Sequence, residues 1–165
     1  MVFKEGYADG KGVEDFKINS FAAMARVIAF DYGTKRIGIA VTDPLQIIAT
    51  GLMTVHPKDV VEFLKNYMQT EEVELFVVGE PRQMDGTASQ STPHVKGFIT
   101  ILKKAFPAIP VERIDERFTS KMASAAISQS GLKKIDRQNK SLVDTVAATI
   151  ILQSWMERRG FLGLY

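Results

Sequence analysis

The chain has 165 residues and a formal net charge of +2. This length is typical of one domain with a core large enough to fold alone. The small positive charge permits a polyanionic partner but does not require one. It contains no cysteine, so disulfides and thiolate metal sites are excluded, which suits a reducing compartment. Its two histidines are too few for a zinc site unaided, and no apolar run approaches the ~18 residues of a membrane span.

The first residues differ in pattern from the rest of the chain. Glycine, lysine, glutamate and aspartate are scattered there without a period. We expect a flexible N-terminal extension at 1–24, a single domain at 25–159 and a short C-terminal tail at 160–165. Whether the extension is an upstream addition, an expression remnant or a regulatory arm stays open.

The first strong pattern is a hairpin with an acid at its bend. The apolar run 27–30 ends in Asp31, a Gly-Thr-Lys-Arg turn follows, and a second apolar run covers 37–41. This pattern predicts two antiparallel strands. A carboxylate at the end of a buried strand is costly unless a partner compensates it. An ordinary surface turn uses the same residue types, so this stretch alone leaves a structural and a functional role equally open.

The remaining chain alternates strands and helices and predicts an α/β fold. Strands are expected over 47–55, 75–79 and 111–114, and helices over 56–72, 92–106, 119–129 and 140–158. The first three strands would form an antiparallel meander. The unbroken apolar run 75–79 is typical of a central strand that is covered on both faces.

Three acids occupy positions where acids are unusual. Asp31 and Glu116 end strands, and Asp144 lies on the apolar face of the last predicted helix, one turn before Ala148. Two carboxylates about 5 Å apart repel by roughly 3 kcal/mol at an effective dielectric near 20. If the three acids meet, they must therefore bind cations or protons, and without cysteine or clustered histidine the fitting cation is Mg²⁺ or Mn²⁺. Each acid alone is more often a cap, a turn residue or half of a salt bridge.

Paired divalent ions on carboxylates are the usual machinery of in-line phosphodiester hydrolysis. Basic side chains near the ends of the acid-bearing elements would form a phosphate-binding rim, and these are Lys35, Arg36, Arg82, Arg117 and Lys140. No motif indicates base-specific contacts, so we expect recognition of shape or backbone.

Four motifs occur in order along the chain. They are DYGTKRIGIA at 31–40, VVGEPRQMDGT at 77–87, DERFTS at 115–120 and KSLVDTVAA at 140–148. Together they resemble the YqgF family, also called RuvX, whose members are described as Holliday junction resolvases or pre-16S rRNA nucleases. The resemblance extends over about 26–158.

The resemblance implies an RNase H-like fold, with a mixed five-stranded sheet and helices on both faces. It implies that Asp31, Glu116 and Asp144 are catalytic acids that bind two Mg²⁺ or Mn²⁺ ions. It also implies a cytoplasmic bacterial enzyme that matures the 5′ end of small-subunit ribosomal RNA.

One residue departs from the family pattern. The family usually has an apolar residue between the glycine and the proline of the second motif, whereas here Glu80 follows Gly79 directly. Glu80 would leave the central strand close to Asp31 and act as an additional or substitute metal ligand. Alternatively, it points into solvent or pairs with Arg82.

Other functions share parts of this pattern. Asp-x-Gly-Thr at a first hairpin also occurs in actin, sugar-kinase and chaperone ATPases, but those proteins enclose ATP between two such domains and this chain has one. A nucleic-acid-binding assembly factor without catalysis would keep the fold. Among nucleases, the rRNA precursor is the favoured substrate and branched DNA stays open, because no motif visibly reads a 2′-hydroxyl. The oligomeric state is also open.

Overall fold

The computed structural model describes residues 25–80, 92–115 and 139–161. Several predictions lie outside these ranges: the extension 1–24, the helix 119–129, and the site residues Arg82, Glu116 and Arg117.

A five-stranded sheet in the order β3-β2-β1-β4-β5 forms the framework of the domain. Its strands are β1 (Arg26–Tyr32), β2 (Ile37–Thr42), β3 (Ala49–Val55), β4 (Val73–Glu80) and β5 (Val111–Asp115). The pairs β1–β2 and β2–β3 are antiparallel, whereas β1–β4 and β4–β5 are parallel. The predicted mixed sheet, with three antiparallel strands first, is confirmed.

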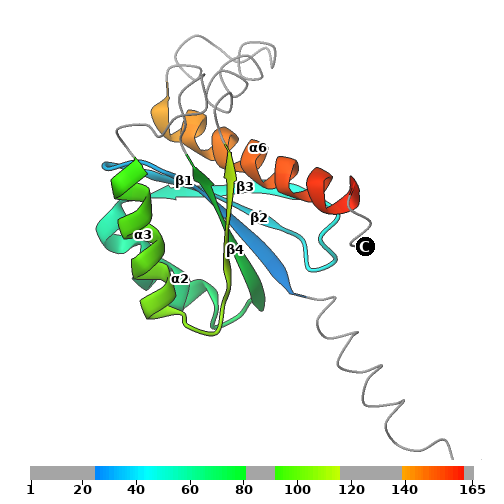
Figure 1. Ribbon diagram of the computed structural model, residues 1–165, viewed down its shortest axis with the longest axis horizontal. Coiled ribbons are helices and arrows are strands. Elements are labelled where there is room, and N and C mark those ends of the chain that lie inside the picture. Colours follow the sequence, from blue (N-terminus) through cyan, green and yellow to red (C-terminus); the bar gives the residue numbers. More distant parts are fainter. Residues whose placement is uncertain (1–24, 81–91, 116–138, 162–165) are drawn as a thin grey trace, which may run out of the picture.

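Helices cover both faces of the sheet, as predicted (Figure 1). The 3₁₀ turn η1 (Pro57–Asp59), α2 (Val60–Tyr67) and α3 (Thr92–Ala105) belong to one side, and α6 (Lys140–Phe161) crosses the other. No helix within the described ranges is long and apolar enough to cross a membrane.

Two hydrophobic cores lie on the two faces of the sheet. On β1, Ile28 and Phe30 pack in the core with α2 and α3, whereas Val27 and Ala29 pack in the core with α6. Alternate residues of β4 divide between the two cores in the same way. This two-sided burial explains why both strands read as unbroken apolar runs.

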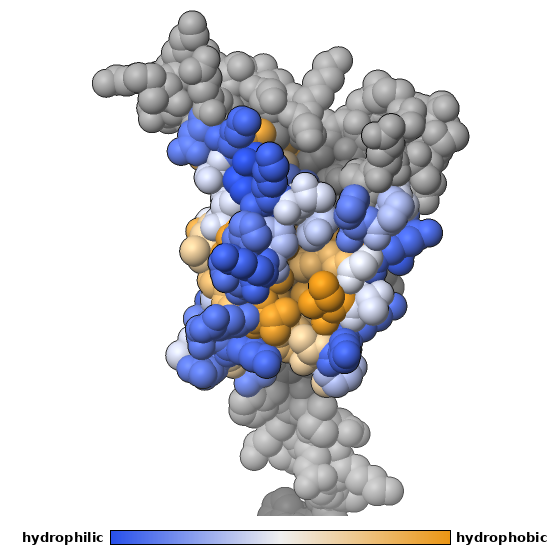
Figure 2. Space-filling view, turned by 90° about the vertical axis from the view of Figure 1, so that its left-hand side faces the viewer, coloured by the Kyte–Doolittle hydropathy of each residue, from blue (hydrophilic) through white to orange (hydrophobic). Residues whose placement is uncertain are grey.

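The side of the molecule that carries α2 and α3 has apolar side chains gathered between hydrophilic flanks (Figure 2). Within the core beneath, the ring of Phe30 meets those of Phe76 and Phe98 edge to face, with centroids 5.5 and 5.4 Å apart. Such aromatic pairs add stabilisation beyond their buried area.

The third strand begins later than the sequence predicts. Asp43 Oδ1 accepts hydrogen bonds from the backbone N–H groups of Ile47 and Ile48, both at 2.7 Å. These bonds hold the two residues in a turn, so β3 starts at Ala49. The pairing of β2 with β3 shifts register between Ile39 and Ala40, opposite Gly51 and Met53.

Two helix boundaries also differ from the prediction. The helix expected over 56–72 begins as the 3₁₀ turn η1, with His56 Nδ1 accepting from the N–H of Lys58, and α2 ends at Tyr67. The last helix includes Gly160 and Phe161, so the tail expected at 160–165 begins inside α6. Helix ends are the least certain boundaries to read from sequence, because they fray and mix with 3₁₀ turns.

Candidate active site

Gly38 is the point at which Asp31 and Asp144 come together. Asp31 lies directly opposite Gly38 in the β1–β2 pair. Helix α6 passes so close to Gly38 that a Cβ atom there would lie 2.1 Å from the carbonyl oxygen of Asp144. Because only glycine leaves this space, Gly38 allows the helix to place Asp144 above the strand end that carries Asp31.

The beginning of α6 is held in place by polar contacts. Asn139 Oδ1 accepts from the N–H of Ser141 at 3.0 Å and so caps the helix. Thr54 Oγ1, on β3, donates to the carbonyl oxygen of Ser141 at 3.0 Å. At Gly51 a Cβ atom would lie 2.4 Å from Thr145 Cγ2, so a second glycine lets the helix approach the sheet. The position of Asp144 is therefore fixed by the sheet beneath it.

A cavity of about 330 Å³ opens beside the two acids. Its walls are formed by the end of β1, the following turn and the first turns of α6: Asp31, Tyr32, Gly33, Thr34, Lys35, Arg36, Lys140 and Asp144. The cavity thus brings together all the predicted site residues within the described ranges, namely Asp31, Asp144, Lys35, Arg36 and Lys140.

The turn between β1 and β2 sets the basic side of this cavity. The N–H of Gly33 donates to the carbonyl oxygen of Arg36 at 2.8 Å, and a Cβ atom on Gly33 would lie 2.7 Å from that oxygen. A tight turn of this kind requires glycine. Lys35 at the turn and Lys140 on α6 are both exposed, so each presents its charge at the cavity mouth.

Arg36 makes the main contact of the site. Its Nε donates to Asp144 Oδ2 at 2.6 Å, and the side chains of Arg36 and Asp144 are 39% and 19% exposed. The carboxylate on the inner side of α6 needs a partner, as the sequence indicates, and that partner is Arg36. The sequence assigns Arg36 only to the phosphate-binding rim, because nothing local connects it with Asp144.

Glu80 lies differently from Asp31. Alternation along β4 places Glu80 on the face of Phe76 and Val78, which pack with α2 and α3, whereas Asp31 shares the α6 face with Ala29. Glu80 Oε1 is 3.7 Å from Nη1 of Arg113 on the neighbouring strand. This geometry gives no support to the predicted ligand role of Glu80.

The donors of the cavity suit a hard divalent ion. Mg²⁺ is usually held by one or two protein carboxylates, with water and substrate phosphate completing its shell. Asp31 and Asp144 supply carboxylate oxygens on one cavity. The described ranges contain no group of three or more histidine, cysteine, aspartate or glutamate side chains that could hold a metal. Glu116, the third predicted acid, follows the last residue of β5 in sequence and lies outside them.

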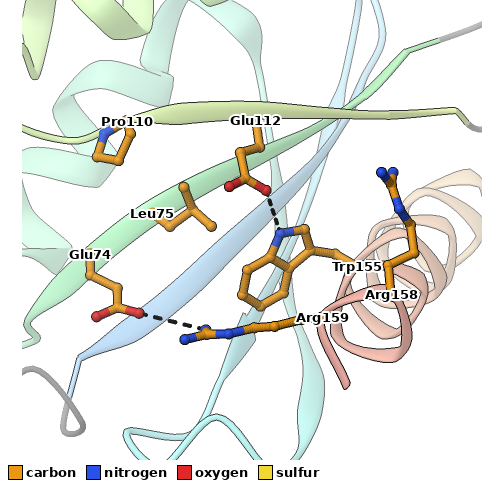
Figure 3. A pocket seen from close by; sticks show the side chains of 7 residues that line it. All are labelled: Glu74, Leu75, Pro110, Glu112, Trp155, Arg158 and Arg159. Atoms are coloured by element: carbon orange, nitrogen blue, oxygen red, sulfur yellow. Dashed lines mark hydrogen bonds and ion pairs between the residues drawn. The ribbon is translucent and has the colours of Figure 1, made fainter. Parts of the chain in front are cut away.

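A second cavity, of about 470 Å³, lies at the other end of α6 (Figure 3). Trp155 Nε1 donates to Glu112 Oε2 at 2.6 Å, and the guanidinium of Arg159 lies 5.2 Å from the centre of the indole ring. Arg159 Nη1 is also 3.9 Å from Glu74 Oε1. These polar groups pair with one another, so the cluster fastens α6 to β4 and β5.

Arg26 and Glu71 form another arginine–carboxylate pair, which lies outside the candidate site. Arg26 Nε donates to Glu71 Oε2 at 2.8 Å, and this hydrogen bond raises the pKa of the Arg26 guanidinium above its ordinary value. A further bond from Arg26 Nη1 to the carbonyl oxygen of Thr42 holds the side chain at the start of β1.

Solved structures of low sequence identity share this fold. The Fowlpox virus resolvase, in a complex with substrate Holliday junction DNA, matches with a TM-score of 0.53 at 15% identity, over 81% of this chain and 97% of the resolvase chain. The yeast mitochondrial Holliday junction resolvase matches with a TM-score of 0.52 at 11% identity, over 88% and 83% of the two chains. The domain is therefore an RNase H-like α/β domain.

Relatives of much higher identity lead to the family. A protein of Christiangramia forsetii, provisionally named pre-16S rRNA nuclease, is 53% identical over 133 residues, which are 81% of this chain and 98% of the relative. A protein of Bacteroides thetaiotaomicron with the same name is 49% identical over 138 residues, or 84% of this chain and 100% of the relative. The family model described as RuvX, Holliday junction resolvase, matches residues 25–158.

The chain belongs to the RuvX family, which confirms the resemblance seen in its sequence. This assignment makes the chain a nuclease, a hydrolase that acts on phosphodiester bonds.

Proposed function

We propose that this nuclease is metal-dependent, that Asp31 and Asp144 hold the metal together with Glu116, and that the substrate is an rRNA precursor. The observation that carries the proposal is the cavity that Asp31 and Asp144 line together with Lys35, Arg36 and Lys140. Such a site suits a phosphodiester, because the basic side chains attract its negative charge while the acids can hold the metal beside the reacting group.

The acids and the basic residues have different tasks in this proposal. Asp31 and Asp144 bind two Mg²⁺ or Mn²⁺ ions with Glu116, and bound ions of this kind supply an activated water and charge stabilisation at the leaving oxygen. Lys35 and Lys140, exposed at the mouth, bind and orient the phosphate backbone. The same task is proposed for Arg82 and Arg117, which lie outside the described residues. Because such contacts release counterions, binding should weaken steeply as salt is raised.

The substrate preference rests on the relatives. Those 49–53% identical to this chain are provisionally named pre-16S rRNA nucleases, which supports a role in maturing the 5′ end of small-subunit rRNA in the cytoplasm. The family description favours a second candidate function, the resolution of four-way DNA junctions.

A parallel cleavage assay separates these substrates. End-labelled rRNA precursor and a four-way DNA junction are incubated with the full chain in Mg²⁺, Mn²⁺ or EDTA, with Asp31→Asn as the control. Cleavage of the RNA that requires metal and is lost in the variant supports the proposal. Preferential cleavage of the junction moves the function to resolution. If both are bound in a strongly salt-dependent way and neither is cut, the metal-dependent reaction proposed here is wrong.

Binding of ATP provides a further check, because Asp-x-Gly-Thr also occurs in phosphate-binding ATPases. The proposal expects no rise in thermal unfolding temperature on addition of ATP with Mg²⁺ beyond the rise that Mg²⁺ alone produces. A clear additional rise would favour the nucleotide-binding alternative.

A further inference from the structure

The contact between Arg36 and Asp144 places a cation of the protein on a carboxylate that the proposed reaction assigns to metal. The bond runs from Arg36 Nε to Asp144 Oδ2 at 2.6 Å. A charge-assisted bond of this length is among the stronger hydrogen bonds of a protein. Since the Asp144 side chain is only 19% exposed, its negative charge is partly removed from water and is stabilised by a positive partner.

The backbone of Arg36 is fixed while its side chain has freedom to move. The carbonyl oxygen of Arg36 accepts the N–H of Gly33 at 2.8 Å, which closes the turn. The side chain is 39% exposed and lines the cavity. Rotation about its side-chain bonds therefore suffices to carry the guanidinium from Asp144 toward the cavity mouth, with no change in the sheet.

A divalent ion and this guanidinium would compete for the negative charge of the same carboxylate. Mg²⁺ binds carboxylate oxygens at about 2.1 Å, so an ion on Asp144 would lie within a few ångströms of Nε. Two cations at that distance repel strongly in a partly buried site. The carboxylate can satisfy its need for a positive partner with either one.

We propose that Arg36 is a displaceable internal counter-ion, which neutralises Asp144 in the metal-free protein and leaves it when a divalent ion binds. The released guanidinium then faces the cavity mouth, where it binds a substrate phosphate. This inference rests on the proposed function, because it requires Asp144 to bind metal. It makes Arg36 a substrate-binding residue that becomes available only when the metal is bound.

The chain provides a matched internal control. Arg26 also donates through Nε to a carboxylate, Glu71, at 2.8 Å, but neither residue lines the cavity of the candidate site. Any general effect of Mg²⁺ on arginine–carboxylate pairs should therefore appear at both arginines. Displacement of the guanidinium by the ion should appear at Arg36 alone.

The test is NMR of the arginine Nε–Hε groups during a titration of the full chain with Mg²⁺. The Arg36 signal is assigned by its loss in Arg36→Lys, and the Arg26 signal by its loss in Arg26→Lys. We expect the Arg36 signal to move in a saturable way toward its position in metal-free Asp144→Asn, while the Arg26 signal stays in place.

Two other results are distinguishable. If Mg²⁺ binds in a way that Asp144→Asn weakens, yet the Arg36 signal stays, the counter-ion role is wrong and the proposed metal site stands. If Mg²⁺ does not bind, or if Asp144→Asn leaves its binding unchanged, the metal role of Asp144 is wrong and the inference fails with it.

A binding measurement with Mn²⁺ gives the size of the effect. Removing a half-exposed competing cation in Arg36→Gln should tighten Mn²⁺ binding by about threefold to tenfold, whereas Arg26→Gln should leave the dissociation constant unchanged. Equal or weaker binding in Arg36→Gln would show that Arg36 supports the site and does not compete for it.

Discussion

The two ends of α6 pack on the same face of one sheet in opposite ways. At the beginning of the helix, Gly38 leaves room for the backbone of α6 to approach the sheet, and Asp144 lies at this point. A cavity lined by charged residues lies beside it. Toward the other end, the large ring of Trp155 packs over the strands and lines the second cavity, and its N–H is paired with Glu112. Both ends contain ionisable residues, so charge alone does not distinguish a functional end from a structural one.

The difference lies in what the charged groups contact. Around Trp155, the carboxylates of Glu74 and Glu112 are engaged by Arg159 and the indole N–H (Figure 3). Beside Gly38, Asp144 is paired with Arg36, yet it faces one cavity together with Asp31, from a distant part of the chain. Two carboxylates that share a cavity repel each other, which costs stability, and such pairs are therefore expected where an ion or substrate binds. We therefore expect the end of α6 near Trp155 to stabilise the fold and the end near Gly38 to carry the reaction.

Trp155→Ala should have the largest effect on stability. Trp155 is 8% exposed, and removing a buried tryptophan side chain costs about 3–5 kcal/mol of unfolding free energy. Chemical denaturation followed by circular dichroism measures this loss. The folded fraction should keep its metal-dependent cleavage, so a loss of cleavage per folded molecule would contradict the division between the two ends.

Gly38→Ala should damage the other end. A Cβ atom would lie 2.1 Å from backbone atoms of α6, so the helix must move away, which costs roughly 1–3 kcal/mol. Because this movement separates Asp144 from Asp31, we expect loss of cleavage and of metal binding even in the folded fraction. The measurements are denaturation, cleavage and Mn²⁺ affinity on the same sample.

The matched control is Gly97→Ala on α3, where an added Cβ meets nothing within 4 Å. Alanine should stabilise this helix by about 0.5–1 kcal/mol and leave cleavage unchanged. If Gly38→Ala behaves like Gly97→Ala, then close approach at Gly38 does not build the site.

Thr42→Val tests a single buried hydrogen bond between β2 and β1, away from the candidate site. Thr42 is fully buried, and its Oγ1 accepts the N–H of Val27 at 2.9 Å. Valine has nearly the same shape and leaves that N–H unpaired, which should cost about 1–2 kcal/mol. We expect denaturation to show this loss while cleavage per folded molecule is unchanged; a fall in cleavage larger than the fall in folded fraction would contradict the separation.

Asp43→Asn should have the smallest effect on stability, and this effect should be present near neutral pH and disappear in acid. Backbone hydrogen bonds from Ile48, Ile47 and Leu45 hold the pKa of Asp43 below its ordinary value of 3.8. A lowered pKa in the folded state gives stability that is complete above the unfolded value and is lost as pH falls through the folded value. The advantage of the native protein over Asp43→Asn should therefore shrink below about pH 4, as thermal unfolding across a pH series would show. A constant difference across the series would contradict the assignment.

The sequence predicts the sheet and the principal site residues because both produce local signals. The apolar runs of β1 and β4 show burial on two faces, and acids at a strand end and on an apolar helix face are conspicuous. Asp31, Asp144, Lys35, Arg36 and Lys140 are indeed brought to one cavity. Their catalytic and binding roles, and those of Glu116, Arg82 and Arg117, remain predictions.

The pairings within both regions could not be predicted from the sequence. The contacts of Arg36 with Asp144 and of Trp155 with Glu112 join residues far apart in the chain, and the local sequence around one partner does not indicate the other. Tertiary packing decides such pairs, so local patterns do not show them. Gly38 did leave a signal, since a glycine inside an apolar strand often marks the close approach of another segment.

We propose that the close approach of α6 at Gly38 brings Asp31 and Asp144 together as one metal site. The most direct measurement is anomalous scattering from crystals of the protein grown or soaked with Mn²⁺. The account predicts an anomalous peak within about 2.2 Å of carboxylate oxygens from both acids, and its disappearance in Asp144→Asn. A peak bound elsewhere, or no peak at a Mn²⁺ concentration that supports cleavage, would contradict it.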